Sequence, residues 1–202
     1  MIIGPRYKIA KRLGAPVFEK TQTQKFAVSE ARTARKKTGR PGGASDYKRQ
    51  HTEKQKMRFV YGVTEKQLRR YIDEALERNT QPILDLVGRL ESRLDNVVHR
   101  LGFAKTRRLA RQIVAHGHIL VNGRRINIPS YKARIGDIVS IREGSKQSPL
   151  FTEIAESLGT HVPKSWLSLD AKKLEGTVKA TPTFEPAEVL FDPQQVLEFY
   201  SR

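Results

Sequence analysis

Apolar residues recur at intervals of three and four along much of the chain, and this spacing predicts amphipathic helices. The clearest case spans residues 64–79. Its apolar positions fall at i, i+3, i+4, i+7 and i+8, namely Leu68, Tyr71, Ile72, Ala75 and Leu76. Thr64 and Gln67 stand three residues apart at its start, which is the spacing of a capping box. We therefore expect a helix that packs one face against a core.

Two further helices are predicted downstream. Pro82 suits the first position of a helix over "PILDLVGRL", because the first N–H groups of a helix have no intrahelical partner. Ser92 and Asp95 repeat the capping spacing, and Gly102 is the predicted stop. The apolar face of this second helix comprises Leu94, Val97, Val98 and Leu101.

The stretch "FAKTRRLARQIVAHGHILVNGRRINI" predicts a helix followed by a β-hairpin. Thr106 is the predicted N-cap and Gly117 the residue just past the helix. The buried stripe comprises Leu109, Ala110, Ile113 and Val114. Asn122-Gly123 is a strong hairpin turn signal. The apolar strand positions are Ile119 and Val121 before the turn, Ile126 and Ile128 after it, and Ile138, Val139 and Ile141 in a third strand.

The first 45 residues lack such periodicity. Gly, Pro, Ser and basic residues cluster in "GPRYKIAKRLG" and "EARTARKKTGRPGGAS". A segment of this composition buries little apolar surface, so we expect it to be extended and to become ordered on a polyanion. Order is expected to begin with a helix capped by Ser45 or Asp46, which carries several basic residues and a thin apolar side.

Charge is concentrated in two blocks. The chain has 38 Lys and Arg against 21 Asp and Glu, a net charge of +17. Residues 1–60 hold 16 basic and 4 acidic residues, and residues 88–143 hold 12 and 4, whereas the other segments are close to neutral. Two basic blocks favour two surfaces that bind nucleic acid. A merely solvated basic surface is the alternative.

The predicted helix after Thr106 carries cations at its positively polarised end, where each costs roughly 0.3–1 kcal/mol. The cations there are Lys105, Arg107 and Arg108. A bound phosphate would reverse the sign of this cost. Arg111 is expected on the same exposed flank, with Arg124 and Arg125 close by at the hairpin turn. On this interpretation, alanine at Arg107, Arg108 and Arg111 weakens nucleic-acid binding and leaves the fold intact; the alternative is that the side chains point into water.

Other kinds of chemistry find little support. Cysteine is absent, which leaves no disulfide or thiolate metal site. His116 and His118 have i, i+2 spacing without a third ligand nearby, which is a weak metal signal. There is no nucleophile-and-base pair, and no apolar run nears the roughly 18 residues of a membrane span. We expect a soluble, non-secreted protein without enzymatic site, cofactor, metal, membrane contact or small-molecule substrate.

The stretch "RLDNVVHRLGFAKTRRLARQIVAHGHILVNGRRINIPSYKARIGDIVSIRE" resembles the S-four RNA-binding module, which also occurs in pseudouridine synthases and some tRNA synthetases. The flanks are more specific. "GPRYKIAKRLG", "SDYKRQHTEKQKMRFVYGVTEKQLRRYIDEAL", "WLSLDAKKLEGTV" and "LEFYSR" resemble, in order, the bacterial-type S-four family of small-subunit ribosomal proteins.

The resemblance implies a primary ribosomal RNA-binding protein. It would bind a multi-helix junction in the 5′ domain of small-subunit RNA, nucleate assembly of the subunit body, and contact ribosomal protein S-five at an interface linked to translational accuracy. Messenger RNA where it enters the ribosome is a further implied partner. The implied location is the small subunit in the cytoplasm, with an organellar ribosome left open. Some relatives carry a zinc-binding cysteine cluster or a "GQHG"-like loop, and this chain instead has no cysteine and "RPGGAS" at residues 40–45.

Basic residues in the matching motifs are the candidate RNA contacts. They are Arg6, Lys8, Lys11, Arg12, Lys48, Arg49, Lys54, Lys56, Arg58, Arg93, Arg100, Lys105, Arg107, Arg108, Arg111, Arg124 and Arg125.

The predicted fold class is α+β. A mostly helical domain over residues 46–91 and 145–202 receives an inserted α/β RNA-binding module over residues 92–144, with two helices on a short antiparallel sheet. Residues 1–45 form a basic, extended N-terminal segment. A free-standing RNA chaperone or translational regulator and an RNA-modifying enzyme are the alternative functions, although about 60 residues after the module are few for a synthase domain.

Overall fold

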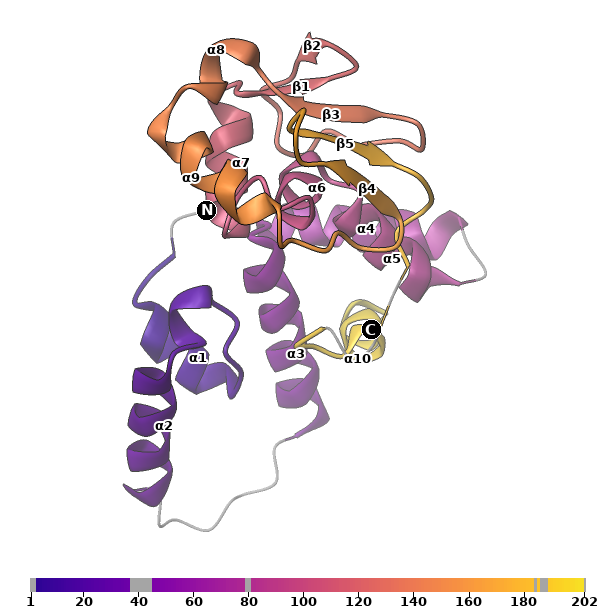
Figure 1. The fold of residues 1–202 in the computed structure, drawn as a ribbon. Helices are drawn as coiled ribbons and strands as arrows, with labels where there is room; N and C mark the ends of the chain where they lie inside the picture. Colours follow the sequence, from indigo (N-terminus) through magenta and orange to yellow (C-terminus); the bar gives the residue numbers. More distant parts are fainter. Residues whose placement is uncertain (1–2, 37–44, 79–80, 184, 186–188, 202) are drawn as a thin grey trace. The chain divides into compact units, whose positions relative to one another are not determined.

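The computed structural model describes residues 3–36, 45–78, 81–183, 185 and 189–201. Except for Ser45, the "RPGGAS" loop lies outside this range. The chain divides into two compact units, residues 1–83 with 185–202 (unit 1) and residues 84–184 (unit 2). Helices predominate, and one five-stranded antiparallel sheet accompanies them, so the predicted α+β class is confirmed (Figure 1). No helix in the described ranges is long and apolar enough to cross a membrane.

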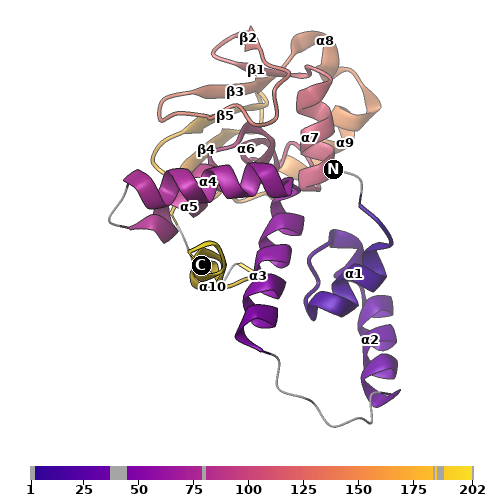
Figure 2. The same ribbon diagram turned by 180° about the vertical axis from the view of Figure 1, so that it is seen from behind.

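Unit 1 is helical. Its elements are α1 (Arg6–Leu13), the 3-10 helix η1 (Glu19–Thr21), α2 (Gln24–Lys36), α3 (Asp46–Tyr61), α4 (Glu65–Arg78) and α10 (Pro193–Tyr200). Helix α5 (Pro82–Glu91) begins at the boundary and continues into unit 2. The C-terminal helix α10 returns to this unit and packs along α3 (Figure 2).

Residues 3–36, the described part of the predicted extended segment before Ser45, are mainly helical and not extended as predicted. Ala10, Leu13, Phe18 and Phe26 are buried with their neighbours in a small core of their own, against which Phe59 of α3 packs. Helices α1 and α2 and the 3-10 helix η1 each contribute only a few apolar residues to this core. They cover one another only after the chain has turned back on itself, so sequence periodicity missed them.

The predicted helix starts in unit 1 are confirmed. Ser45 accepts a hydrogen bond from the Lys48 amide at 3.4 Å. At the start of α4 the Gln67 side chain accepts from the Thr64 amide at 3.1 Å, and the Thr64 hydroxyl accepts from the Gln67 amide at 3.3 Å. The predicted apolar face of α4 is buried up to Ala75, whereas Leu76 is 42% exposed.

Glu65 joins three helices of unit 1. Its carboxylate accepts hydrogen bonds from Lys54 at 2.9 Å and Arg58 at 3.0 Å, both in α3, and from the Tyr200 hydroxyl in α10. The Lys54 ammonium also lies 4.4 Å from the centre of the Phe199 ring. Burial by itself would raise the pKa of Glu65, but hydrogen bonds from Tyr200, Lys54 and Arg58 favour the carboxylate and hold the pKa below its ordinary value.

We predict that Glu65→Gln flattens the acid dependence of stability. A carboxyl whose pKa is lower in the folded state stabilises the fold above its unfolded pKa and loses that effect as pH falls through the folded pKa. The variant should lose about 1 kcal/mol of unfolding free energy at neutral pH, a modest value because the carboxylate is partly exposed. The loss should shrink as pH falls below the ordinary value of 4.5. Urea unfolding at pH 7, 5, 4 and 3 measures it; the exposed Glu77→Gln is the control, and equal behaviour of the two variants would contradict the prediction.

Unit 2 contains most of α5 and a layer of helices beside the sheet. Its elements are α6 (Leu94–Arg100), α7 (Arg107–Ala115), β1 (Ile119–Val121), β2 (Arg124–Arg125), β3 (Ile138–Ile141), α8 (Glu143–Lys146), α9 (Pro149–Leu158), β4 (Leu167–Asp170) and β5 (Glu175–Val178). Helices α6, α7 and α9 lie together beside the sheet in both views (Figures 1 and 2). Their apolar faces and the sheet enclose a core that includes Leu101, Ile113, Phe151 and Trp166.

The predicted hairpin is confirmed at its turn. Asn122 and Gly123 have φ angles of 51° and 76°, as a type I′ turn requires. The register pairs Ile119 with Ile141 and Val121 with Val139, which places these side chains in the core. The predicted alternation of buried and exposed residues does not continue after the turn. Strand β2 ends at Arg125, and the side chains of Ile128 and Ile138 are 56% and 45% exposed.

The sheet is larger than the sequence pattern indicates. Its strand order is β2-β1-β3-β5-β4, so the β4–β5 hairpin extends the sheet through β5 pairing with β3. The divisions of the chain therefore differ from those predicted: residues 145–184 lie in unit 2, and only residues 185–202 join the N-terminal helices. The pairing of β5 with β3 links strands more than 30 residues apart, and local patterns do not report such a contact.

We predict that Gly176→Ala destabilises unit 2. A Cβ at this position would lie 2.3 Å from Cδ2 of Leu101, which is fully buried, so β5 and α6 would have to separate. Overpacking of this kind typically costs about 1–3 kcal/mol. Gly88→Ala is the control, because among the described residues its Cβ meets no atom within 4 Å, and helix α5 should gain about 0.5–1 kcal/mol. Thermal or urea unfolding measures both, and an unchanged midpoint for Gly176→Ala would argue against the close packing of β5 on α6.

Candidate nucleic-acid interface

Helix α7 begins and ends at the predicted residues. The Thr106 hydroxyl accepts a hydrogen bond from the Leu109 amide at 3.1 Å, and Gly117 follows the helix with a φ of 72°. The first turn of α7 contains no acidic residue. The helix therefore begins with cations and has no acidic residue in its own first turn, as the sequence indicates.

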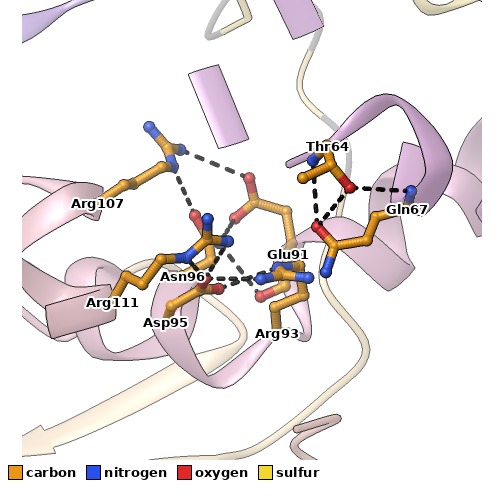
Figure 3. Close-up of polar contacts among 8 residues, drawn as sticks. All are labelled: Thr64, Gln67, Glu91, Arg93, Asp95, Asn96, Arg107 and Arg111. Carbon is orange, nitrogen blue, oxygen red and sulfur yellow. Dashed lines mark hydrogen bonds and ion pairs between the residues drawn. The ribbon is translucent and has the colours of Figure 1, made fainter. Parts of the chain in front are cut away.

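Two of these cations bend back onto α6 (Figure 3). Nε and Nη2 of Arg111 lie 3.0 Å and 2.8 Å from Oδ2 of Asp95. Nε of Arg107 donates to Oδ1 of Asn96 at 2.7 Å, and its Nη2 lies 3.8 Å from Oε1 of Glu91. The side chains of Arg107 and Arg111 are only 22% and 29% exposed.

The same acceptors hold further arginines. Arg93, which is 2% exposed, donates through Nε and Nη2 to both oxygens of Asp95 at 3.0 Å and 2.7 Å. Arg100 donates to both oxygens of Glu91 at 2.9 Å and 3.0 Å. The Asn96 amide also donates to Glu91 at 2.6 Å. We call this set the arginine network; it comprises Glu91, Arg93, Asp95, Asn96, Arg100, Arg107 and Arg111.

This arrangement corrects the predicted cap of α6. The N-cap residue is Arg93 and its side chain makes no capping hydrogen bond. Ser92 instead donates to the Gly88 carbonyl at 2.6 Å, and Asp95 is occupied by two guanidinium groups. The first amides of α6 are satisfied by loop carbonyls, for example the Leu94 amide by Tyr131 at 2.8 Å.

The prediction that the cations of α7 share one exposed flank is wrong, because they divide into two sets. Arg107 and Arg111 are paired with Glu91 and Asp95, which are each 4% exposed. Placing cations at a helix N-terminus costs free energy, and these two buried carboxylates offset part of that cost. Lys105 and Arg108 are exposed, and the contact of Lys105 with Glu153 at 3.6 Å is a weak surface pair.

The hairpin adds exposed cations next to the end of α7. Arg124 and Arg125 are exposed, and Nη2 of Arg125 donates to the His116 carbonyl at 3.1 Å. The Arg125 side chain lies so close to Gly117 that a Cβ there would collide with it. The predicted closeness of the hairpin to this helix is confirmed.

Sequence reasoning missed Arg142 at this corner. Arg142 is exposed, its amide donates to the His118 carbonyl at 2.8 Å, and its Nε lies 3.4 Å from the Ser145 hydroxyl. Burial is the main cause that lowers the pKa of His118, and the neighbouring Arg142 lowers it further. The signal was present, since Arg142 directly follows the buried Ile141 in the strand alternation.

Among the described residues, no cluster of three or more His, Cys, Asp or Glu is arranged to hold a metal ion.

The candidate residues of unit 1 also differ in availability. Lys8, Arg12, Lys48 and Arg49 are exposed, and Arg6 and Lys11 are partly exposed. Lys56 and Arg58 are mostly buried in pairs with Glu53 at 2.7 Å and Glu65 at 3.0 Å. Lys54 is 6% exposed and belongs to the Glu65 contacts described above. We therefore leave Lys54 and the similarly buried Arg93 out of the proposed RNA-facing surfaces.

A basic groove on α4 was also missed. It has a volume of about 450 Å³ and is lined by Thr64, Lys66, Gln67, Arg69, Arg70 and Asp73. The three basic residues stand at i, i+3 and i+4, opposite the apolar face of the helix. That spacing could have indicated the groove from sequence, but the segment has a net charge close to zero and was therefore not considered as a binding surface.

Comparisons with known proteins match nearly the whole chain. A family model described as "Ribosomal protein S4/S9 N-terminal domain" matches residues 1–91, and one described as "S4 domain" matches residues 92–139. The "Small ribosomal subunit protein uS4" of Chloroflexus aurantiacus is 43% identical over 202 residues, which is 99% of this chain and 98% of the relative. The protein of the same name from Persephonella marina is 46% identical over 205 residues, 98% of each chain. This chain belongs to the uS4 family.

Membership of the uS4 family confirms the resemblance seen in the sequence. The chain is a structural component of the small ribosomal subunit and carries an RNA-binding domain, and it is not an enzyme. The S4 domain match covers α6, α7, β1, β2 and the first half of β3, and therefore includes most of the arginine network.

We predict that Arg111→Ala lowers the stability of unit 2 and that Arg108→Ala does not. Removing Arg111 deprives the buried Asp95 of one of its two guanidinium partners, a loss of about 1–3 kcal/mol. Removing the exposed Arg108 takes a cation from a helix N-terminus, so stability should stay within about 0.5 kcal/mol or rise slightly. Urea unfolding measures both, and equal stability of the two variants would mean that the pairing with Asp95 contributes nothing. This expectation replaces the one drawn from sequence, that all three arginines can be removed without effect on the fold.

Proposed function

We propose that the protein is a primary binder of small-subunit ribosomal RNA that recognises a multi-helix junction in the 5′ domain and nucleates assembly of the subunit body. The observation that carries this proposal is the set of exposed cations at the two ends of α7 in unit 2. Lys105 and Arg108 precede or begin α7, Arg124 and Arg125 lie at the end of the same helix, and Arg142 adds to them. Arginine forks bind phosphates with two hydrogen bonds, and a helix N-terminus adds amide donors.

The residue types favour folded RNA over single strands. Single strands are usually bound by stacking bases on exposed aromatic rings. In the described part of unit 2, Phe103, Phe151 and Trp166 are buried and Tyr131 is half-buried. Duplex RNA presents phosphates and 2′-hydroxyls, which match a surface of arginines and lysines.

Unit 1 supports a second RNA-binding surface. Lys8, Arg12, Lys48 and Arg49 are exposed on α1 and α3, and the basic groove lies on α4. Two separate surfaces on two units suit a junction, because its helices run in different directions. We propose messenger RNA where it enters the ribosome as a further partner of the basic residues, on the family resemblance alone.

Ribosomal protein S-five is the proposed protein partner, with a role in translational accuracy. An aromatic cluster on α3 and α10 supports a protein contact. Tyr47 is 57% exposed, and its ring centre lies 5.5 Å from that of Phe199 and 6.1 Å from that of His51. Exposed aromatic side chains are enriched in protein interfaces. The proposed location is the small subunit of a cytoplasmic or organellar ribosome.

The proposal predicts a preference for folded RNA. The full chain should bind a transcript of the 5′ domain at least about tenfold more tightly than the same transcript with its junction helices disrupted by base changes. Each phosphate that the protein neutralises should add roughly 0.7–0.9 to the slope of log affinity against log salt. Filter binding or fluorescence anisotropy at several KCl concentrations measures both quantities. Equal affinity for the two transcripts would defeat the proposal.

Sedimentation separates the proposal from its alternative. A structural component should co-sediment with small subunits after a high-salt wash. Release into the free pool would favour a free-standing RNA chaperone or translational regulator.

A further inference from the structure

We propose that Asp95 and Glu91 are positioning residues for phosphate recognition, acting through the arginines that they hold. This inference rests on the proposed RNA-binding function and assigns a role to two acidic groups within a basic surface. Neither carboxylate is expected to touch RNA, because each is 4% exposed and surrounded by its own donors.

The geometry supports an orienting role. Both contacts of Arg111 with Asp95 come from one edge of the guanidinium, Nε and Nη2. That edge-on contact fixes the plane of the fork while the side chain keeps 29% of its surface exposed. Arg107 is held in a comparable way, through Nε on Asn96 and Nη2 near Glu91, and keeps 22% exposed. An arginine whose fork is already oriented loses less conformational freedom when it binds a phosphate.

The carboxylates of Asp95 and Glu91 are themselves held in place by two further arginines. Arg93 binds both oxygens of Asp95, and Arg100 binds both oxygens of Glu91. Asn96 connects the two halves, because its amide nitrogen donates to Glu91 while its oxygen accepts from Arg107. The inner arginines thus keep the acceptors in place, and the acceptors orient the outer arginines.

Electrostatics alone predicts the opposite effect of these acidic groups. A carboxylate beside an RNA-binding surface repels phosphate, so replacing it by a neutral amide raises the net positive charge by one and should tighten binding. A positioning role predicts weaker binding from the same substitution. The sign of the change in affinity therefore distinguishes the two explanations.

The test compares Asp95→Asn and Glu91→Gln with Glu153→Gln in the full chain, using the 5′-domain transcript. Glu153 is the matched control because its side chain is 71% exposed and its contact with Lys105 is long, at 3.6 Å. Both network variants should bind RNA at least about tenfold more weakly. Loss of a residue that orients a metal ligand weakens metal binding by a similar factor. Their salt slopes should also become shallower by roughly 0.7–0.9 for each phosphate that the variant no longer neutralises. Glu153→Gln should bind as tightly as the unaltered protein or more tightly.

A double-mutant cycle separates positioning from a general loss of structure. Affinities are measured below the melting temperature of each variant, with the binding-competent fraction determined by stoichiometric titration. If Asp95 acts through Arg111, Asp95→Asn should have little further effect on affinity in an Arg111→Ala background. Equal losses in both backgrounds would show that Asp95 acts through the fold alone and would overturn the inference.

The outcomes also separate this inference from the proposed function. If the unaltered protein prefers folded RNA while Asp95→Asn and Glu91→Gln bind as tightly as it does, or more tightly, the positioning role is wrong and the RNA-binding function stands. If the unaltered protein shows no preference for the folded transcript, both are wrong.

Discussion

The pairing of two buried carboxylates with arginines is the interaction on which unit 2 depends. A buried carboxylate is strongly unfavourable unless it is paired and fully hydrogen-bonded. Glu91 ends α5 and Asp95 begins α6, so satisfying them draws α7 onto α6 through Arg107 and Arg111. Packing of apolar residues often stabilises a protein as well as such a network does, and the proposed positioning role gives a further reason for its presence in this domain.

The network also changes the meaning of the net charge of +17. Some of the basic residues that contribute to it, such as Arg93 and Lys54, are buried against carboxylates of the same unit. Others, such as Arg108 and Arg124, are exposed and available to a polyanion. Total charge thus indicates the kind of partner, whereas the positions of the acidic residues decide which cations can reach it.

Features set by neighbouring residues were predictable from sequence. The capping box of Thr64 and Gln67, the cap at Thr106 and the turn at Asn122-Gly123 each depend on groups within four residues of one another. Features set by distant residues were not. The core of α1, η1 and α2 and the pairing of β5 with β3 both require the chain to return on itself, and no local period reports that proximity.

The sequence by itself determined helices α5, α6 and α7, the turn between β1 and β2, the two basic blocks and, through motif order, the family. It also placed cations at the start of α7, because residue type and helix register are local properties. Only the tertiary structure decided which of these cations are exposed. Arg107 and Arg108 are neighbours in sequence, yet the helix directs Arg107 toward Asn96 and Glu91 and leaves Arg108 in solvent. The reason is that Glu91, Asp95 and Asn96 come from helices that meet α7 only after folding, and a buried carboxylate is strongly unfavourable unless it is paired and hydrogen-bonded.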